Sequence, residues 1–237
     1  MRKLKISVKE LYKSFKKKVV LKNLNLDIYE SESLAIIGES GSGKSILTRC
    51  VTGLVEYETG KILFENLGNV KEFNFNDKMK YMSNFGILFQ NSALLDSLTI
   101  FENLRFAKEE KNFNKILDEV GLPKSILNKF PSELSVGMQK RVGLARAIIK
   151  DPEVLILDEP TTGLDPIIAR QINLLIKNLV KKKKITTITV TNDMESVYEF
   201  TDHVAFLKEG RIEWYGDAKK INKSNNLNLK NFIKGIE

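Results

Sequence analysis

Cysteine and histidine are nearly missing from this chain of 237 residues, which has one of each. A single cysteine, Cys50, excludes an internal disulfide and fits a protein of a reducing compartment. Long apolar runs are missing as well, since runs such as residues 154–157 fall far short of the ~20 residues that a membrane span requires. The start of the chain has no apolar segment of the kind found in signal peptides. We therefore expect a chain that neither crosses a membrane nor is exported.

The charge is unevenly distributed along the chain. The formal net charge is +8, and residues 1–22 account for the excess with nine Lys or Arg against one acid, Glu10. A basic segment can indicate nucleic acid or an anionic membrane surface, but lysines also protect exposed strand edges from pairing. We favour the solvated strand edge and predict no nucleic-acid partner.

A glycine-rich loop is the most informative segment. It matches G-x-x-x-x-G-K-[ST], with the apolar run 33–37 before it and a helical pattern at 46–51 after it. Backbone N–H groups of such a loop converge on a phosphate, and the dipole of the following helix adds to the attraction. Lys44 is predicted to reach the β- and γ-phosphates, and the Ser45 hydroxyl to hold Mg²⁺. The predicted nucleotide-binding residues here are Gly38, Glu39, Ser40, Gly41, Ser42, Gly43, Lys44, Ser45 and Ile46.

Two acids follow a second apolar run. Residues 154–157 are apolar without alternation, which is typical of a parallel strand buried on both faces. Asp158 and Glu159 come at its carboxyl end, where ligands bind in open α/β sheets. We predict that Asp158 holds Mg²⁺ and that Glu159 polarises the attacking water. A pair that caps a helix is the alternative interpretation.

The rest of the pattern predicts an α/β fold with one domain over residues 1–237. Alternation indicates antiparallel strands at the start, and helical periodicity with clustered breakers indicates a helical insertion at about 91–150. The polar segment 66–80 is predicted to be a surface loop, and residues 222–228 a linker within a short C-terminal tail at about 217–237. Predicted strands lie at 6–11, 24–28, 60–64, 85–89, 186–190, 203–207 and 211–215, and predicted helices at 135–149, 167–183 and 194–200.

The order of these motifs resembles the ATP-binding subunit of an ABC transporter over nearly the full length. The phosphate loop is followed by Gln90, by Leu-Ser-Val-Gly-Met-Gln at 134–139, by the strand that ends at Glu159, and by Gly-Leu-Asp at 163–165. The 134–139 signature distinguishes this family from other P-loop proteins, which lack it. The resemblance implies a P-loop NTPase with a mostly parallel core sheet, an N-terminal antiparallel β-subdomain and a helical subdomain insertion. It also implies ATP with Mg²⁺, and a head-to-tail dimer in which each ATP lies between one copy's phosphate loop and the other copy's signature.

The resemblance implies roles for further residues. Gln90 would sense Mg²⁺ and the attacking water, and Asp165 would cross the dimer interface. Phe15 matches the position that stacks on adenine, with Tyr12 as a fallback. The signature residues expected at the γ-phosphate of the partner's ATP are Ser135, Val136, Gly137 and Met138.

Two positions depart from the family pattern. Val136 replaces a glycine of the signature, and Asn192 stands where the family usually has a catalytic histidine before Asp193. His203 is eleven residues further on and is not expected to take that role. An Asn amide can donate one hydrogen bond, but it cannot become cationic. The hypothesis is a slow ATPase with Glu159 as its essential group.

A finer resemblance concerns residues 85–108 and 131–170, which are similar to ATPases of bacterial phospholipid transporters that work with MCE-domain proteins (the Mla type). It implies a permease and an MCE-domain partner, lipid transport, and a peripheral place on the cytoplasmic face of the inner membrane. The segment after Gln90 would then receive the coupling helices of the permease, and an exposed apolar groove is expected there. The alternatives are the ATPase of another ABC importer and a dimerising regulatory module with weak hydrolysis. DNA-repair or ribosomal relatives would be longer, and a metabolic kinase would lack the signature.

Overall fold

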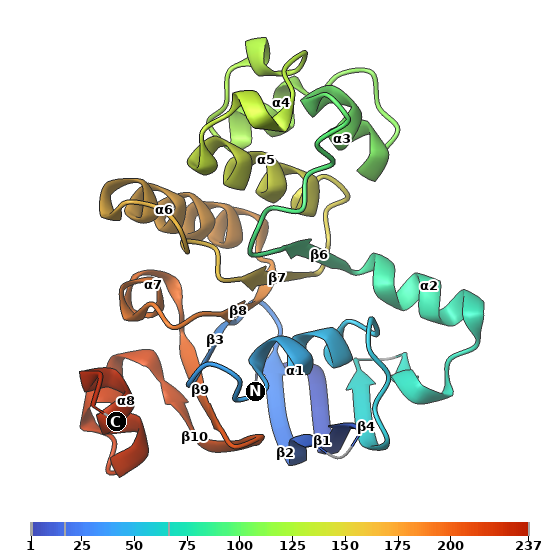
Figure 1. The fold of residues 1–237 in the computed structure, drawn as a ribbon. Helices are drawn as coiled ribbons and strands as arrows, with labels where there is room; N and C mark the ends of the chain where they lie inside the picture. Colours follow the sequence, from blue (N-terminus) through green and yellow to red (C-terminus); the bar gives the residue numbers. More distant parts are fainter. Residues whose placement is uncertain (1, 17, 66, 237) are drawn as a thin grey trace.

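The computed structural model describes residues 2–16, 18–65 and 67–236, which form two sheets and a helical lobe (Figure 1). One sheet is antiparallel, with the order β2-β1-β4-β5, and the other has the order β10-β9-β3-β8-β7-β6. In the second sheet all neighbours are parallel except β9 and β10. This arrangement confirms the predicted α/β fold with an N-terminal antiparallel sheet and a mostly parallel core sheet.

The elements have these bounds. The strands are β1 (Leu4–Phe15), β2 (Lys18–Tyr29), β3 (Ser33–Ile37), β4 (Thr59–Phe64), β5 (Gly68–Asn69), β6 (Phe85–Leu88), β7 (Val154–Asp158), β8 (Thr186–Val190), β9 (His203–Lys208) and β10 (Arg211–Asp217). The helices are α1 (Lys44–Val51), α2 (Phe75–Ser83), α3 (Ile100–Ala107), α4 (Asn114–Glu119), α5 (Val136–Ile148), α6 (Pro166–Lys183), α7 (Met194–Phe200) and α8 (Leu227–Lys234). Short 3-10 turns lie at Val70–Glu72, Lys124–Ile126, Pro131–Glu133 and Ala218–Lys223.

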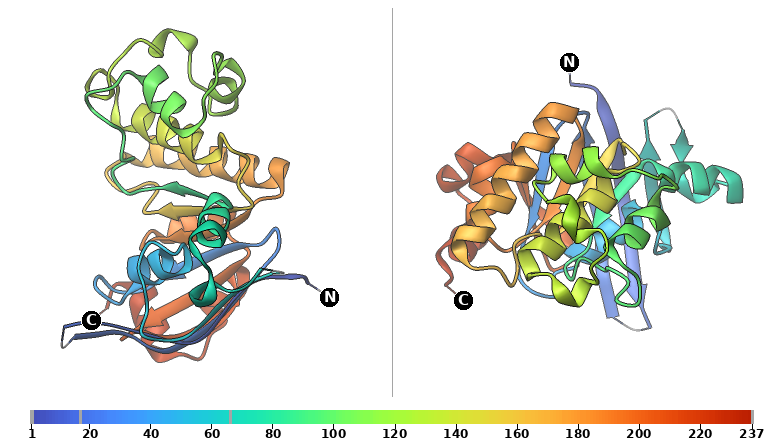
Figure 2. Two further views of the ribbon diagram at one scale, coloured as in Figure 1. Left: turned by 90° about the vertical axis from the view of Figure 1, so that its right-hand side faces the viewer. Right: turned by 90° about the horizontal axis from the view of Figure 1, so that it is seen from above.

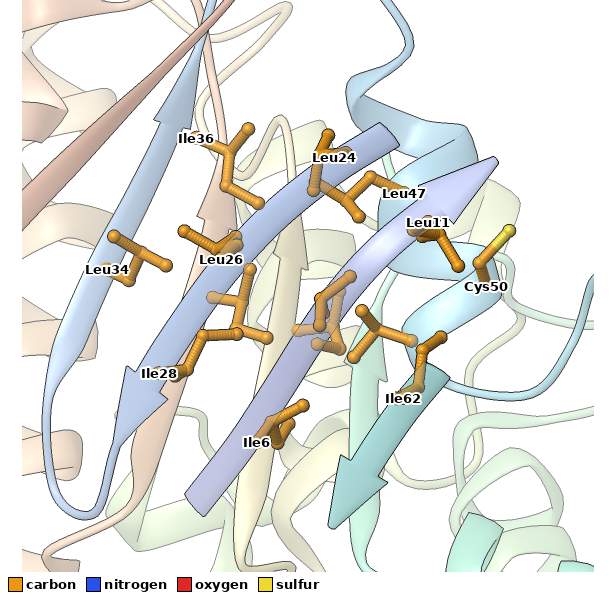
Figure 3. Close-up of a cluster of buried hydrophobic side chains, with 14 of the residues drawn as sticks. Ile6, Leu11, Leu24, Leu26, Ile28, Leu34, Ile36, Leu47, Cys50 and Ile62 are labelled. Atoms are coloured by element: carbon orange, nitrogen blue, oxygen red, sulfur yellow. The ribbon is translucent and has the colours of Figure 1, made fainter. Parts of the chain in front are cut away.

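Helix α1 joins the two sheets through one hydrophobic cluster (Figure 3). Leu47 and Cys50 of α1 pack in this cluster with Leu11 of β1 and Ile36 of β3, and all four side chains are almost fully buried. The helix that follows the phosphate loop is therefore fixed from both sides. Because the carboxyl end of the phosphate loop runs into α1, this packing also fixes that end of the loop.

The other face of the core sheet is covered by α5 and α6. Along β7, Val154 and Ile156 belong to the α1 cluster, whereas Leu155 and Leu157 belong to a second cluster with residues of α3–α6. The strand is buried on both faces, as its uninterrupted apolar pattern predicts. Helices α3, α4 and α5 form a lobe on this side of the sheet, opposite the antiparallel sheet (Figure 2).

The predicted surface loop at 66–80 is wrong over most of its described length. The segment contains β5, a 3-10 turn and α2 instead. Asn69 and Asn74 are the N-caps of the last two, with their side chains accepting from the backbone N–H groups of Lys71 and Asp77. Asparagine favours helix caps as well as loops, so the same residues that are typical of irregular structure here begin a 3-10 turn and a helix. Asn66 lies outside the described residues.

The C-terminal segment packs on the core sheet. Ile221 and Leu229 are buried in a cluster with Phe206 of β9. The predicted linker at 222–228 is shorter than expected, because α8 begins at Leu227 with Asn226 as its N-cap.

No helix in the described part of the chain is both long and apolar enough to cross a membrane. Of the basic residues near the start, Lys5 is an exception to the predicted solvated edge. Its side chain is buried and pairs with Glu65 at 2.6 Å and with Glu153.

Candidate functional site

Four parallel strands of the core sheet deliver polar residues to one edge. The phosphate loop follows β3, Gln90 follows β6, Asp158 ends β7 with Glu159 directly after it, and Asn192 follows β8. A cleft of about 940 Å³ lies at this edge. It is lined by many residues predicted from the sequence, namely Phe15, Ser40, Gly41, Gly43, Lys44, Ser45, Ile46, Gln90, Asp158, Glu159 and Asn192.

The phosphate loop requires glycine for steric reasons. Gly38 has φ of +151°, and a Cβ there would lie 2.1 Å from the carbonyl oxygen of Leu207. Gly43 has φ of +110°, and a Cβ would meet the carbonyl of Val20 at 3.1 Å. The loop thus follows a path that residues with side chains rarely adopt. Within it, the Ser42 hydroxyl is buried and has no hydrogen-bond partner among the described residues, and Ser42 does not line the cleft.

Lys44 points back into the loop. Its ammonium donates to the carbonyl oxygens of Gly38 at 2.6 Å and Glu39 at 3.0 Å, and the side chain is buried. Burial lowers the pKa of Lys44, while the nearby carboxylates of Glu159, Asp158 and Glu39 act in the opposite direction. A cation held in this way is complementary to a bound phosphate chain.

Two of the three residues predicted to hold or sense Mg²⁺, Ser45 and Asp158, lie side by side. The Ser45 hydroxyl donates to Oδ1 of Asp158 over 3.5 Å. Burial raises the pKa of Asp158, although Arg49, Ser45 and Lys44 lower it. A hydroxyl and a carboxylate are the hard oxygen donors that Mg²⁺ prefers, so these residues fit the ion.

Glu159 begins a sharp turn after β7. It has φ of +48°, its N–H donates to the carbonyl of Val190 at 2.8 Å, and its Oε2 accepts from the Thr162 hydroxyl at 3.0 Å. The next helix, α6, is capped by Asp165 through the N–H groups of Ile167 and Ile168. The interpretation of Asp158 and Glu159 as a capping pair is therefore wrong.

The turn after β8 presents Asn192 to the cleft. Its neighbour Asp193 caps α7 and accepts hydrogen bonds from the hydroxyls of Thr161 at 3.2 Å and Ser196. These contacts tie the turn after β8 to the turn after β7. The histidine lies elsewhere, because Nδ1 of His203 is 2.8 Å from the Glu32 carboxylate and His203 does not line the cleft.

Phe15 supplies an aromatic ring at the mouth of the cleft. It is the last residue of β1, its side chain is 45% exposed, and the Lys13 ammonium lies 4.7 Å from the ring centroid. Tyr12 does not line the cleft. Of the two aromatic candidates for stacking on the base, Phe15 is therefore the one that lines the cleft.

The signature residues are not in the cleft of their own chain. Ser135 caps α5 by accepting from the N–H of Met138, and the Val136 side chain beside it is 51% exposed. Gly137 lies against α6, where a Cβ would be 2.8 Å from Ile168 Cγ2. Among the described residues that line the cleft, none comes from this segment, and Asp165 is also absent from the lining.

Lys140 is a residue of the site that was not predicted from the sequence. This buried lysine of α5 donates to the backbone carbonyls of Gln90 and, at 3.2 Å, of Glu159. Its position offered a signal, because Gly143, Leu144 and Ala147 stand three, four and seven residues later and indicate a buried helix face. A lysine on such a face needs a buried acceptor.

A glycine-rich loop between a parallel strand and a helix, with a serine and an aspartate beside it, defines a P-loop nucleoside triphosphatase. The comparisons with known proteins specify the family. The family model described as ABC transporter matches residues 21–162. The methionine import ATP-binding protein MetN of Clostridioides difficile (strain 630) is 35% identical over 237 residues, which cover 96% of this chain and 73% of that protein. The chain belongs to the ABC transporter family of ATP-binding proteins, and as such binds ATP with Mg²⁺ and is an ATPase.

Other similar proteins agree with this assignment. The Arabidopsis thaliana protein TRIGALACTOSYLDIACYLGLYCEROL 3, chloroplastic, is 34% identical over 256 residues, covering 97% of this chain and 73% of that one. The dimeric post-hydrolysis structure of the cassette MJ0796 with ADP and Pi gives a TM-score of 0.79 at 28% identity, covering 90% of this chain and 98% of that one. The structure of cbiO1 from Clostridium perfringens, part of the transporter complex cbiONQ, gives 0.84 at 29% identity, covering 98% and 96%.

The resemblance to Mla-type ATPases with MCE-domain partners is not supported by these comparisons. The bacterial relative above is named as an import ATPase for methionine, and others are named for iron(III) and for sulfate or thiosulfate. Segments 85–108 and 131–170 carried that resemblance.

Proposed function

We propose that this chain is the ATP-hydrolysing subunit of an ABC importer and works as a head-to-tail dimer on a transmembrane permease. One observation carries the proposal. The cleft collects the phosphate loop, the candidate Mg²⁺ ligands, Glu159 and Phe15, but it lacks every signature residue of its own chain. Half of a nucleotide site is therefore present in each copy.

The residues of the cleft have distinct tasks in this proposal. Phe15 stacks on the base, the loop from Gly38 to Ile46 surrounds the phosphates, and Lys44 neutralises their charge. Ser45 and Asp158 would hold Mg²⁺, which would supply positive charge against the charge that develops on the phosphate. Glu159 accepts a proton from the attacking water, while Gln90 and Asn192 orient it by hydrogen bonds.

The second copy supplies the missing half. The Ser135 hydroxyl and the free N–H groups at the start of α5 form a helix terminus that attracts anions. Asp165 lies at the start of α6, beside the signature helix, and would meet the partner's turn. Val136 projects from the same tip with half of its side chain exposed, so it would reduce the space near the γ-phosphate.

The permease is proposed to dock on the helical lobe, whose extent we place at about 91–150. Leu95, Phe106 and Phe130 are exposed there, Phe106 by 76%. A cavity of about 400 Å³ at Phe106 is lined by Leu98, Glu102, Arg105, Phe106 and Glu109. This surface would place the chain peripherally, on the cytoplasmic face of the inner membrane, next to a permease.

Importer relatives favour uptake of a small solute. A (phospho)lipid cargo, with an MCE-domain protein as partner, is the second candidate, because the name of the Arabidopsis relative contains that of a glycolipid. The permease distinguishes the two candidates. Purification of the tagged chain from detergent-solubilised membranes should recover a solute permease; recovery of an MCE-domain protein instead would favour lipid.

Turnover of the assembled complex tests the ATPase roles. Glu159→Gln should lower kcat by at least roughly 10²-fold, because the variant loses the group that accepts the proton. Asn192→His should raise kcat by up to roughly 10²-fold, because an imidazole can donate to the γ-phosphate as a cation. Full activity of Glu159→Gln would contradict the proposal.

A further inference from the structure

Lys140 is a buried cation with an unusual set of partners. Its side chain is 2% exposed, and its ammonium donates to the backbone carbonyls of Gln90 and of Glu159. Among the described residues it forms no ion pair with a carboxylate. Two turns that come from different strands, β6 and β7, are thus joined by one side chain of α5.

A second cation of α5 holds the same segment further along. Arg146 donates to the carbonyls of Ser92 at 2.8 Å and Ala93 at 2.7 Å. Both of these residues have positive φ, so the segment after Gln90 is tightly turned. Helix α5 therefore holds this segment at both ends, but only Lys140 also reaches Glu159.

We propose that Lys140 is a positioning residue for ATP hydrolysis, which fixes Gln90 and Glu159 relative to each other and to α5. The inference rests on the proposed roles of these two residues. Because Ser135 starts the same helix about one and a half turns earlier, a movement of the signature tip carries Lys140 with it. Contact between the signature tip and the nucleotide bound by the partner copy would thereby change the positions of Gln90 and Glu159 in the chain that carries the tip.

Energetic considerations favour this role over simple packing. Burying an ammonium is costly, and apolar residues of similar volume often replace buried ions without loss of stability. Burial lowers the pKa of Lys140, and the negative potential of Glu159 and Asp158 offsets part of that effect. An uncharged side chain could fill this space, whereas only a donor can hold two carbonyls. A displacement of about 1 Å at a reacting group can cost 10²-fold in rate.

The test compares Lys140→Met with Lys150→Met in the full chain. Lys150 is an exposed residue just after α5, so its variant removes one positive charge without these contacts. Three quantities are measured: kcat with Mg²⁺-ATP, affinity for a fluorescent ATP analogue, and hydrogen exchange in peptides that contain Gln90 and Glu159. For Lys140→Met we expect kcat to fall by about 10–100-fold, exchange in both peptides to accelerate, and affinity to change by less than about threefold.

The outcomes separate this inference from the proposed function. Wild-type kcat and exchange in folded Lys140→Met would overturn the role of Lys140, and equal effects of Lys150→Met would do the same. Should Lys140→Met not fold, Lys140→Gln replaces it, with kcat expected to fall by about threefold or more because the amide is shorter and uncharged. Glu159→Gln is measured in parallel, since an active Glu159→Gln would refute the proposed function itself.

Discussion

Among single residues, Asp158 is one whose charge destabilises the folded chain while it serves as a candidate Mg²⁺ ligand. The carboxylate is partly buried at the end of β7, and burial outweighs Arg49, Ser45 and Lys44 in setting its pKa above the usual value. The ionised carboxylate of Asp158 is therefore less stable in the folded protein than it would be in water. Such groups are frequent where a ligand supplies the compensation.

We predict that Asp158→Asn stabilises the nucleotide-free protein and weakens its use of Mg²⁺. The neutral amide has no charge to desolvate, so Tm should rise by about 2–4 °C, which corresponds to roughly 1 kcal/mol in a chain of this size. The affinity for Mg²⁺ should fall by about tenfold or more. Thermal melting without Mg²⁺ and a magnesium titration of nucleotide binding check the two parts; a lower Tm would contradict the argument.

Cys50 gives a second prediction at this scale. Its side chain is fully buried on α1, and burial raises the pKa of the thiol to about 11. Because the thiolate is the reactive form, the native protein should resist alkylation at pH 8 and react only when it unfolds. Labelling followed by mass spectrometry at increasing urea checks this. Fast labelling without urea would show that α1 is more open than the structure indicates.

The same thiol affects stability at high pH. Between the ordinary pKa of about 9 and the folded value of about 11, the unfolded chain carries a thiolate while the folded chain keeps its proton. The unfolded state then binds fewer protons, so the free energy of unfolding falls as pH rises through this window. Cys50→Ala should remove this part of the alkaline destabilisation.

At the scale of elements, the contact between β6 and α5 leaves no room for a side chain. A Cβ on Gly86 would lie 2.1 Å from the carbonyl oxygen of Ala147. The glycine lets α5 approach the sheet closely, and that approach brings Lys140 to Gln90. The packing of one strand against one helix thus shapes the cleft.

We predict that Gly86→Ala destabilises the protein by about 3 kcal/mol or more, because the helix must move away from the strand. Tm should fall by roughly 6–12 °C. Gly68→Ala is the control: it has φ of +89° but no atom within 4 Å of the added Cβ, so it should cost only about 1 kcal/mol. Equal losses in the two variants would show that Gly86 is not required for packing.

The sequence predicted most elements, but not all contacts between them. Strands such as β7 have strong apolar patterns, and α6 has a clear cap and a long amphipathic stretch, so their local signals suffice. Helix α2 was missed because its asparagine cap resembles a loop signal. Lys140 was missed because its acceptors are backbone carbonyls far away in sequence, and only the fold brings them together.

At the scale of the whole molecule, each chain holds two surfaces with complementary chemistry. The cleft can surround phosphates from one side, and the α5 tip with Ser135 and Val136, which does not line that cleft, has an anion-attracting helix terminus. Because one chain cannot bring these surfaces together without separating α5 from the core sheet, the proposed solution is a second copy.

The most direct test is sedimentation velocity of Glu159→Gln with and without Mg²⁺-ATP, since slowed hydrolysis preserves any closed state. We predict a monomer without nucleotide and a dimer with it. Adding Ser135→Arg should abolish the dimer while nucleotide binding persists, because the new side chain obstructs the helix tip but leaves the cleft intact. A protein that encloses and hydrolyses Mg²⁺-ATP as a monomer, at a specific rate independent of protein concentration, would contradict the account.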